Sequence, residues 1–255
     1  MSELARPGEA KDVGAALRRY TPARVGLGRT GVSLETRELL GFNLAHARAR
    51  DAVHARLDGG WLARVLGEIC GVEVLRLRSE ARDRATYLKR PDLGRKLDDA
   101  SRDLVAGKKQ SGERVLALVI ADGLSALGVE RHAPALLREL LPQLSHWHLA
   151  PICIVEQGRV AIGDEIGQAL NARIAVVLIG ERPGLSSPDS MGAYVTWAPR
   201  PGRTDAERNC VSNIRSEGLG PRQAASELAD TLLEASRRQL TGVSLKATPR
   251  MLEKG

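Results

Sequence analysis

Several short groups of residues in this chain have types and spacings that could support chemistry. The segment 26–31, Gly-Leu-Gly-Arg-Thr-Gly, matches the G-x-G-x-x-G pattern of dinucleotide sites, and Asp51 follows it by about twenty residues. That pattern requires a central strand before the glycines and the acidic residue at the end of a second strand. Residues 21–25 are short and contain a proline, and Asp51 lies inside an expected helix. We therefore interpret the glycines as a corner that fixes backbone geometry, with a partner subunit as a possible neighbour.

The histidines and serines form no convincing catalytic or metal-binding set. His46 and His54 share one expected helix, but no third ligand or neighbouring carboxylate completes a metal site. Asp122 and Ser125 follow an expected strand, where they are suited to cap a helix or bind polar ligand groups, yet no G-x-S-x-G surrounds Ser125. The other histidines accompany no evident nucleophile: His132, His146 and His148. We expect no catalytic residue and no metal site in this chain.

The cysteines indicate reduced thiols. Cys70, Cys153 and Cys210 are an odd number and have no C-x-x-C spacing. This disfavours both a disulfide framework and a zinc site.

The segment 180–213 is the most informative part of the chain. The run before it, residues 173–180, is apolar and β-branched, which predicts a strand buried on both faces of a parallel sheet. We expect a long loop after this strand, and such loops in compact domains are usually functional or disordered. Ligands of parallel sheets bind beyond the carboxyl ends of the strands. The segment therefore predicts a ligand site with these candidate residues: Glu181, Arg182, Asp189, Tyr194, Trp197, Arg208 and Cys210.

The elements that position these residues change character along the chain. The first part predicts a helix over 33–57 with Ser33 as its N-cap, a helix over 61–69, an isolated strand or extended connector over 72–77, and a helix over 91–105. The second part predicts strands over 116–120, 152–155, 174–179 and 194–197, and helices over 131–144, 164–170 and 223–239. Alternating strands and helices indicate three layers around a mainly parallel sheet.

The fold class that follows is α/β. We expect an N-terminal mainly helical region over residues 1–110 and a Rossmann-like three-layer domain over residues 111–255, with the boundary near Ser111.

Composition limits the classes of function. A chain of 255 residues with 43% hydrophobic residues can form a real core, and it contains no run of eighteen apolar residues. Its first thirteen residues lack the apolar core of a secretory signal, so we expect a cytoplasmic protein.

The basic charge of the chain invites a nucleic-acid interpretation. The formal charge is +7 and the isoelectric point is about 9.7. Only 3% of residues are aromatic, whereas proteins that bind single strands stack bases on aromatic rings. Arginines such as Arg48 and Arg50 alternate with alanines and acids along expected helices, which is typical of a solvated face. The alternative is an acidic partner or a phosphate.

A series of segments resembles a known family, and the segments occur in the family's order. They lie at residues 24–31, 36–40, 46–51, 87–95, 120–125, 158–162, 180–184 and 210–213. Together they span roughly residues 20 to 240 and resemble the small (light) subunit of ethanolamine ammonia-lyase.

This resemblance implies an adenosylcobalamin enzyme that converts ethanolamine to acetaldehyde and ammonia by a radical mechanism. In that family a large subunit, a TIM barrel, binds the substrate, and the cobalamin lies between the two subunits of a hetero-oligomer. The chain would then hold the cofactor without touching the substrate.

The resemblance also implies three cofactor-binding residues: Val160, Glu181 and Cys210. The first two fall just after expected strands, so they share one edge of the sheet. Glu181 can accept a hydrogen bond from a corrin amide, Val160 can pack or offer its backbone, and Cys210 is a small polarizable group. The alternatives are that Val160 is only core, that Glu181 pairs with Arg182 or Arg208, and that Cys210 is a buried thiol.

Two further expectations concern the cofactor and the location. No histidine lies in the D-x-H-x-x-G motif with which many cobalamin domains replace the cofactor's own base, so we expect base-on binding. Some members of the family carry a longer leader that helps direct them into a bacterial microcompartment, whereas about twenty residues precede Arg24. We expect a cytoplasmic protein, with a microcompartment as the other location.

The alternative function is a stand-alone nucleotide- or RNA-binding α/β protein, suggested by the charge and the strand–helix alternation. The expected lyase subunit has no membrane and no nucleic acid among its partners.

Overall fold

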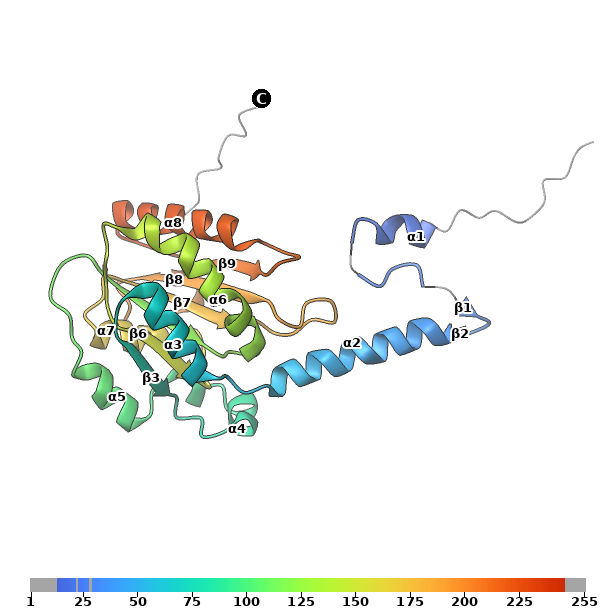
Figure 1. Cartoon of the computed structure of the whole chain (residues 1–255), viewed down its shortest axis with the longest axis horizontal. Coiled ribbons are helices and arrows are strands. Elements are labelled where there is room, and N and C mark those ends of the chain that lie inside the picture. The colour runs from blue at the N-terminus through green and yellow to red at the C-terminus, as the bar shows by residue number, and fades with distance from the viewer. Residues whose placement is uncertain (1–12, 22, 28, 246–255) are drawn as a thin grey trace, which may run out of the picture.

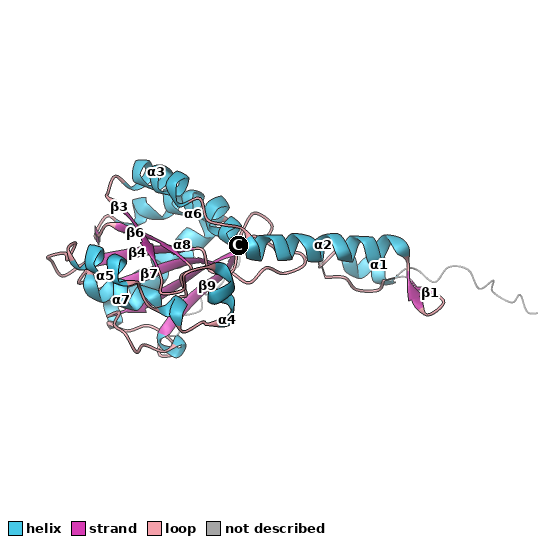
Figure 2. Cartoon of the chain, turned by 90° about the horizontal axis from the view of Figure 1, so that it is seen from below, coloured by secondary structure: helices cyan, strands magenta, loops and turns pink. Residues whose placement is uncertain are grey.

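The computed structural model describes residues 13–21, 23–27 and 29–245, which form a body and an arm (Figure 1). We define the arm as residues 13–54. It consists of α1 (Val13–Arg18), the small hairpin of β1 (Arg29–Thr30) and β2 (Ser33–Leu34), and α2 (Thr36–His54). The body follows from residue 55. The arm extends from one side of the body in two views turned by 90° (Figures 1 and 2).

A mostly parallel sheet forms the centre of the body. Its order is β3 (Val74–Arg78), β6 (Ile152–Glu156), β4 (Val115–Ala121), β7 (Ile174–Gly180), β8 (Met191–Trp197) and β9 (Arg208–Ile214), with the short β5 (His148–Leu149) beside β4. Neighbouring strands are parallel from β3 to β7, while β8 is antiparallel to both β7 and β9. The carboxyl ends of β6, β4 and β7 therefore meet at one edge of the sheet.

Helices cover both faces of the sheet (Figure 2). One face packs on α3 (Gly59–Cys70), α6 (Ala126–Leu140) and α8 (Pro221–Arg238), and the other packs on α5 (Asp99–Ala106) and α7 (Ile162–Ala169). Successive residues of β4 alternate between the two cores: Leu118 and Ile120 face α6, and Val119 and Ala121 face α7. Both sets are buried, which explains why β4 reads as a continuous apolar run.

Side-chain caps begin several body helices. Asp58 accepts a hydrogen bond from the backbone N–H of Trp61 at 2.9 Å and begins α3, and Asp83 begins α4 (Arg84–Lys89) in the same way. Ser125 begins α6, because its hydroxyl oxygen accepts from Gly128 N–H. Each cap satisfies an N–H that the helix itself leaves without a partner.

A buried ion pair joins β9 to α7. The two terminal nitrogens of Arg208 each donate to an oxygen of Asp164 at 2.7 Å, and both side chains are only 2% exposed. Arg208 also donates to the Thr196 hydroxyl at 2.9 Å. The terminal nitrogens of Arg208 thus have partners within the protein, whereas its Nε is buried without a hydrogen bond.

The structure corrects several expectations for the first half of the chain. Ser33 is not the N-cap of the long helix: it lies in β2, and α2 begins at Thr36 after Glu35. Residues 91–105 are not one helix, because the short 3-10 turn Leu93–Arg95 is followed by an extended segment and then by α5, which Asp98 caps.

The strand β3 belongs to the main sheet. Residues 72–77 were expected as an isolated strand or a connector, but β3 pairs with β6 along five residues. The sheet thus includes a strand from before Ser111, and the domain boundary near Ser111 stays a prediction.

The expected long loop after residue 180 is interrupted by two strands. It contains all of β8 and β9, so only residues 181–190 and 198–207 connect strands. The strand β8 was expected in part, whereas β9 was missed. In β9 only Arg208, Val211 and Ile214 are buried, and the residues between them are half-buried or exposed. The strand therefore lacks both the continuous apolar run and the strict alternation that predict a strand. The outcome is a three-strand meander, β7–β8–β9, in place of a loop.

Candidate functional site

A cavity of about 490 Å³ opens at the carboxyl edge of the sheet. Three loops form most of it: the loop after β4, the loop after β6 and the loop after β7. Its lining residues include Tyr87, Gly123, Leu124, Arg159, Val160, Gly180, Glu181, Arg182, Ser187, Ser190, Tyr194 and Asn213. This is the position at which ligands of parallel sheets bind, and the volume lies within the roughly 300–1,000 Å³ of small-molecule sites.

Close backbone contact holds two of these loops together. Leu124 N–H donates to the carbonyl oxygen of Gly180 at 2.9 Å. A Cβ atom at position 180 would lie 1.9 Å from the carbonyl oxygen of Ser125, so only glycine fits there. The end of β7 is therefore fixed against the start of α6, and Glu181 begins from a defined point.

The carboxylate of Glu181 lies at the end of β9. Both of its oxygens are 3.2 Å from Asn213 N–H, which donates to them, and Asn213 itself has a left-handed backbone with φ of 57°. The alternative pairing with Arg208 is wrong, since Arg208 pairs with Asp164. Among the described residues no ion pair joins Glu181 to Arg182. The carboxylate oxygens thus keep lone pairs for a further donor.

Val160 lies in the short loop between β6 and α7. It is half-buried, packs against the core on the α7 side of the sheet and also lines the cavity. The interpretation of Val160 as core alone is therefore incomplete. Its carbonyl accepts Gly163 N–H at 3.1 Å in the first turn of the helix.

Cys210 lies near the cavity without lining it. It stands directly opposite Tyr194 in the register of β8 and β9, and Tyr194 does line the cavity. The interpretation of Cys210 as a buried residue is wrong, because it is exposed on β9. Partial burial of its thiol raises its pKa, while a hydrogen bond with Tyr194 acts in the opposite direction. The structure brings Val160 and Glu181 to one cavity. Cys210 does not line this cavity but lies beside Tyr194, which does.

A buried cluster beneath the cavity was missed from sequence. Tyr87 is fully buried and donates its hydroxyl to the carbonyl of Gly158 at 3.2 Å. Asp122 accepts Gly158 N–H at 3.1 Å, and its burial raises its pKa to about 6 against the hydrogen bonds that it accepts. Arg84 lies 3.8 Å from Asp122 and donates to the Gly123 carbonyl at 2.8 Å. These residues fix the loop that carries Val160.

Sequence contained a partial signal for this cluster. Tyr87 and Asp122 lie in two of the segments that carry the family resemblance, but no spacing connects α4 with the loops after β4 and β6. Only the packed structure brings them together.

The other sequence patterns lie away from this cavity. Gly31 has φ of 66° at the turn of the β1–β2 hairpin, in the arm, and no strand of the main sheet precedes it; Gly28 lies outside the described residues. None of the histidines lines the cavity, and no group of three or more candidate ligands within the described chain could hold a metal ion. No described helix has both the length and the apolarity needed to span a membrane.

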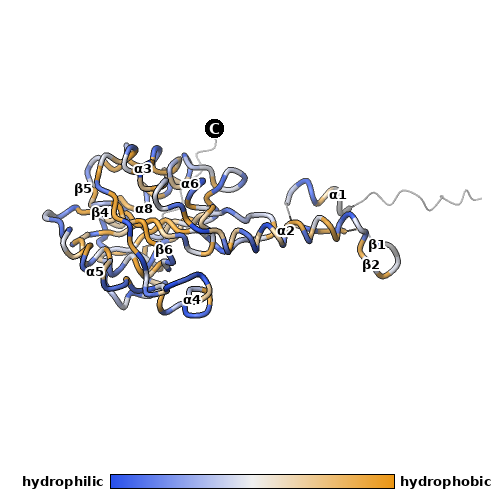
Figure 3. The backbone as a smooth tube through the Cα atoms, turned by 60° about the horizontal axis from the view of Figure 1, so that its bottom comes forward, coloured by the Kyte–Doolittle hydropathy of each residue, from blue (hydrophilic) through white to orange (hydrophobic). Residues whose placement is uncertain are grey.

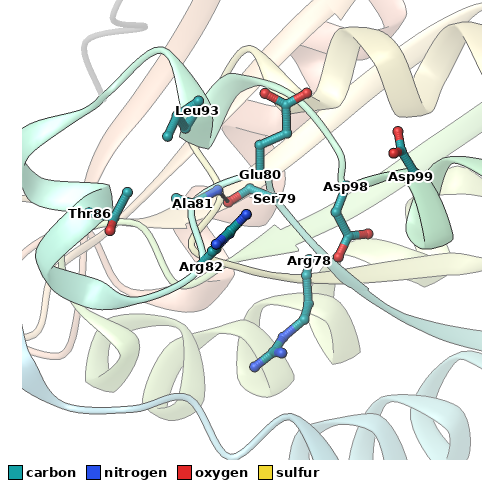
Figure 4. Close-up of a pocket in the computed structure, with 9 residues that line it drawn as sticks. All are labelled: Arg78, Ser79, Glu80, Ala81, Arg82, Thr86, Leu93, Asp98 and Asp99. Atoms are coloured by element: carbon teal, nitrogen blue, oxygen red, sulfur yellow. Dashed lines mark hydrogen bonds between the residues drawn. The ribbon is translucent and has the colours of Figure 1, made fainter.

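A second pocket, of about 660 Å³, lies beyond the end of β3 (Figure 4). Its charges are largely used within the protein. Glu80 lies 3.7 Å from Arg102, Asp98 caps α5, and Arg78 turns away from these carboxylates to bind Glu156 at 3.1 Å. The cavity at the ends of β4, β6 and β7 is the better candidate site.

Comparison with known proteins gives one consistent family. The family model of the ethanolamine ammonia-lyase light chain matches residues 11–246. The chain is 54% identical over 240 residues to the ethanolamine ammonia-lyase small subunit of Xanthomonas campestris, covering 92% of this chain and 88% of the relative. It is 57% identical over 234 residues to the protein of that name from Azotobacter vinelandii, covering 90% and 86%. Identity to the Pseudomonas aeruginosa small subunit is 55% over 236 residues, covering 90% and 85%.

Proposed function

Because the chain belongs to the ethanolamine ammonia-lyase light chain family, we propose that it is the cobalamin-holding subunit of an adenosylcobalamin-dependent ethanolamine ammonia-lyase. The enzyme would convert ethanolamine to acetaldehyde and ammonia. The observation that carries the proposal is the meeting of Val160 and Glu181 at one cavity on the carboxyl edge of the sheet. We also propose that the body is a Rossmann-like domain.

The cavity residues fit one face of a corrinoid. Corrin is a broad apolar ring fringed with amides, and the cavity offers the apolar side chain of Val160 beside the carboxylate of Glu181. Glu181 is already held by Asn213 N–H, so it can accept from a cofactor amide without first being ordered. Cys210 would contact the cofactor from beyond Tyr194. The cavity is smaller than a whole cobalamin, which supports a second subunit over the remainder.

The chemistry of the reaction would not come from this chain. When bound, the cofactor would supply a cobalt–carbon bond whose homolytic cleavage provides the radical that begins the reaction. The residues of this chain would bind and orient it. The placement of the histidines supports base-on binding, because none of them lines the cavity.

The arm supports a partner subunit. Val32, Leu39, Leu40 and Leu44 are each 46% to 94% exposed, and the outer part of α2 carries apolar segments (Figure 3). The base of the arm lies beside the site, since Arg84 donates both to the Val53 carbonyl at 2.5 Å and to Gly123 at the cavity. We propose that the large subunit, a TIM barrel, covers both the cavity and the arm.

The proposed location follows from the same assignment. The chain would act in the cytoplasm, with a bacterial microcompartment as the second possibility. The stand-alone nucleotide- or RNA-binding alternative has no support from the family to which the chain belongs.

The experiment that tests the proposal is reconstitution. The chain is co-expressed with a candidate large subunit, and acetaldehyde release from ethanolamine is measured with and without adenosylcobalamin. We expect the chains to co-purify and turnover to require the cofactor. Val160→Trp, which fills the cavity, should raise the KM for cofactor at least tenfold with the KM for ethanolamine unchanged, whereas Val243→Trp, at an exposed position, should alter neither. Failure to co-purify together with absence of turnover would remove the proposal.

A further inference from the structure

Arg159 is held rigidly at the cavity. Its guanidinium carbon lies 4.1 Å from the centre of the Tyr87 ring, and one terminal nitrogen donates to the Tyr87 carbonyl at 3.1 Å. Its backbone N–H donates to the Gly94 carbonyl at 2.7 Å, and a Cβ atom at position 94 would come within 2.8 Å of the Arg159 side chain. Stacking on an aromatic ring leaves the edge of a guanidinium available to an anion.

The charge of Arg159 is not balanced by the protein. Among the described residues no carboxylate forms an ion pair with it, and its Nε is buried without a hydrogen-bond partner. The buried acid Asp122 lies 3.8 Å from Arg84, whose guanidinium carbon is also 4.8 Å from the Tyr87 ring centre. A guanidinium that lines a cavity and has no carboxylate partner is suited to bind an anionic ligand.

The cavity as a whole keeps a positive charge. It is lined by two guanidinium groups, Arg159 and Arg182, and by one carboxylate, Glu181, which accepts from Asn213. Ser187 and Ser190 also line the cavity. Guanidinium and hydroxyl donors around a concave site are the set that binds phosphate oxygens.

We propose that Arg159 binds the phosphodiester of the cofactor's nucleotide loop. This inference rests on the proposed function and adds a residue to it. The amides around a corrin ring are neutral, so the phosphodiester is the one anionic group of cobalamin that an unbalanced guanidinium would select. With Glu181 as a second polar contact, two fixed points would set the orientation of the corrin and would favour corrinoids that keep the nucleotide loop.

The test isolates the phosphate by comparing two ligands. The complex of this chain with the large subunit is titrated with adenosylcobinamide and with adenosylcobinamide phosphate, and binding is followed by the visible absorption of the corrin. Both ligands lack the lower base and differ by the phosphate. We expect the native complex to bind the phosphate form about tenfold to a hundredfold more tightly, as for hydrogen bonds to a charged group. Arg159→Gln should abolish this preference and change cobinamide affinity by less than about threefold.

Two further variants keep the result interpretable. Arg159→Lys retains the charge without the fork and should keep part of the preference, which covers the case in which Arg159→Gln does not assemble. Arg222→Gln alters a cation on α8 that is 91% exposed and does not line the cavity, and it should keep the preference within about threefold.

The outcomes separate the inference from the proposed function. If Arg159→Gln keeps the phosphate preference, or weakens both ligands equally, Arg159 does not bind phosphate, while the proposed function stands. If the native complex binds both ligands equally, the inference is overturned in the same way. If the native complex binds neither ligand, the inference is overturned, and if it also fails to bind adenosylcobalamin, the proposed function is lost as well.

Discussion

The body and the arm use apolar residues in opposite ways. In the body, β4 and β7 are buried on both faces, so their apolar side chains stabilise the fold of the body. In the arm, α2 is nineteen residues long with only Ala45 and Ala52 buried, while Leu40 is 62% exposed. Helices gain most of their stability in proteins from packing of an apolar face. The body therefore buries its apolar residues within its own layers, whereas α2 leaves its leucines exposed.

The largest change in the free energy of unfolding should come from loss of the buried ion pair of the body. Asp164→Ala leaves Arg208 buried without its carboxylate and should lower the free energy of unfolding by about 3–5 kcal/mol in urea denaturation. The matched control is Asp205→Ala: Asp205 lies 3.5 Å from Arg208 but is 91% exposed, so its loss should cost less than about 0.5 kcal/mol. Equal effects of the two changes would show that the body does not depend on its buried pair.

A smaller effect should follow the ionisation of Asp122. Burial raises its pKa from 3.8 to about 6, so the folded state takes up a proton that the unfolded chain has lost between these values. Stability should therefore fall as the pH rises from about 4 to 6, by up to about 3 kcal/mol, and be constant with respect to this group above that range.

The variant Asp122→Asn isolates this effect, because it keeps an acceptor for Gly158 N–H but does not ionise. Measured by urea denaturation at several pH values, the stability of Asp122→Asn relative to the native chain should increase from pH 4 to pH 6. A difference that is the same at every pH would contradict the prediction.

The smallest effect on folding should come from the arm. Replacing Leu40 and Leu44 by Glu should change the free energy of unfolding of the isolated chain by less than about 0.5 kcal/mol, because both side chains are already in water. The same variant should lose co-purification with the large subunit, while Arg48→Gln on the same helix should keep it. A loss of more than about 1 kcal/mol in the isolated chain would show that the arm packs on its own body.

The sequence correctly predicted the strands and helices whose burial follows from their apolar pattern alone. Strands β4, β6 and β7 are continuous apolar runs, and α3, α7 and α8 were expected within a few residues of their observed bounds. The strand β9 was missed because Arg208 and Asn209 make it look polar, although Arg208 is buried by its pairing with Asp164. Arg208 is charged and nevertheless buried because its partner Asp164, distant in the sequence, pairs with it.

The residues of the candidate site also fall into those that sequence could place and those that it could not. The strand-end rule brought Val160 and Glu181 to one edge, since each follows a recognisable apolar strand. The position of Cys210 depends on the register of β8 with β9, which could not be predicted because β9 itself was missed. Arg159 and Tyr87 depend on packing between α4 and the loop after β6, so they became visible only in the structure.

We propose that the cavity on this chain holds one face of the cofactor against the large subunit. Electron cryomicroscopy of the reconstituted complex with adenosylcobalamin would show whether it does. We expect corrin density against Val160 and Glu181, with Cys210 in contact and the dimethylbenzimidazole still bound to cobalt. Cofactor density enclosed wholly by the large subunit, with this cavity facing away from it, would show that the cavity does not hold the cofactor.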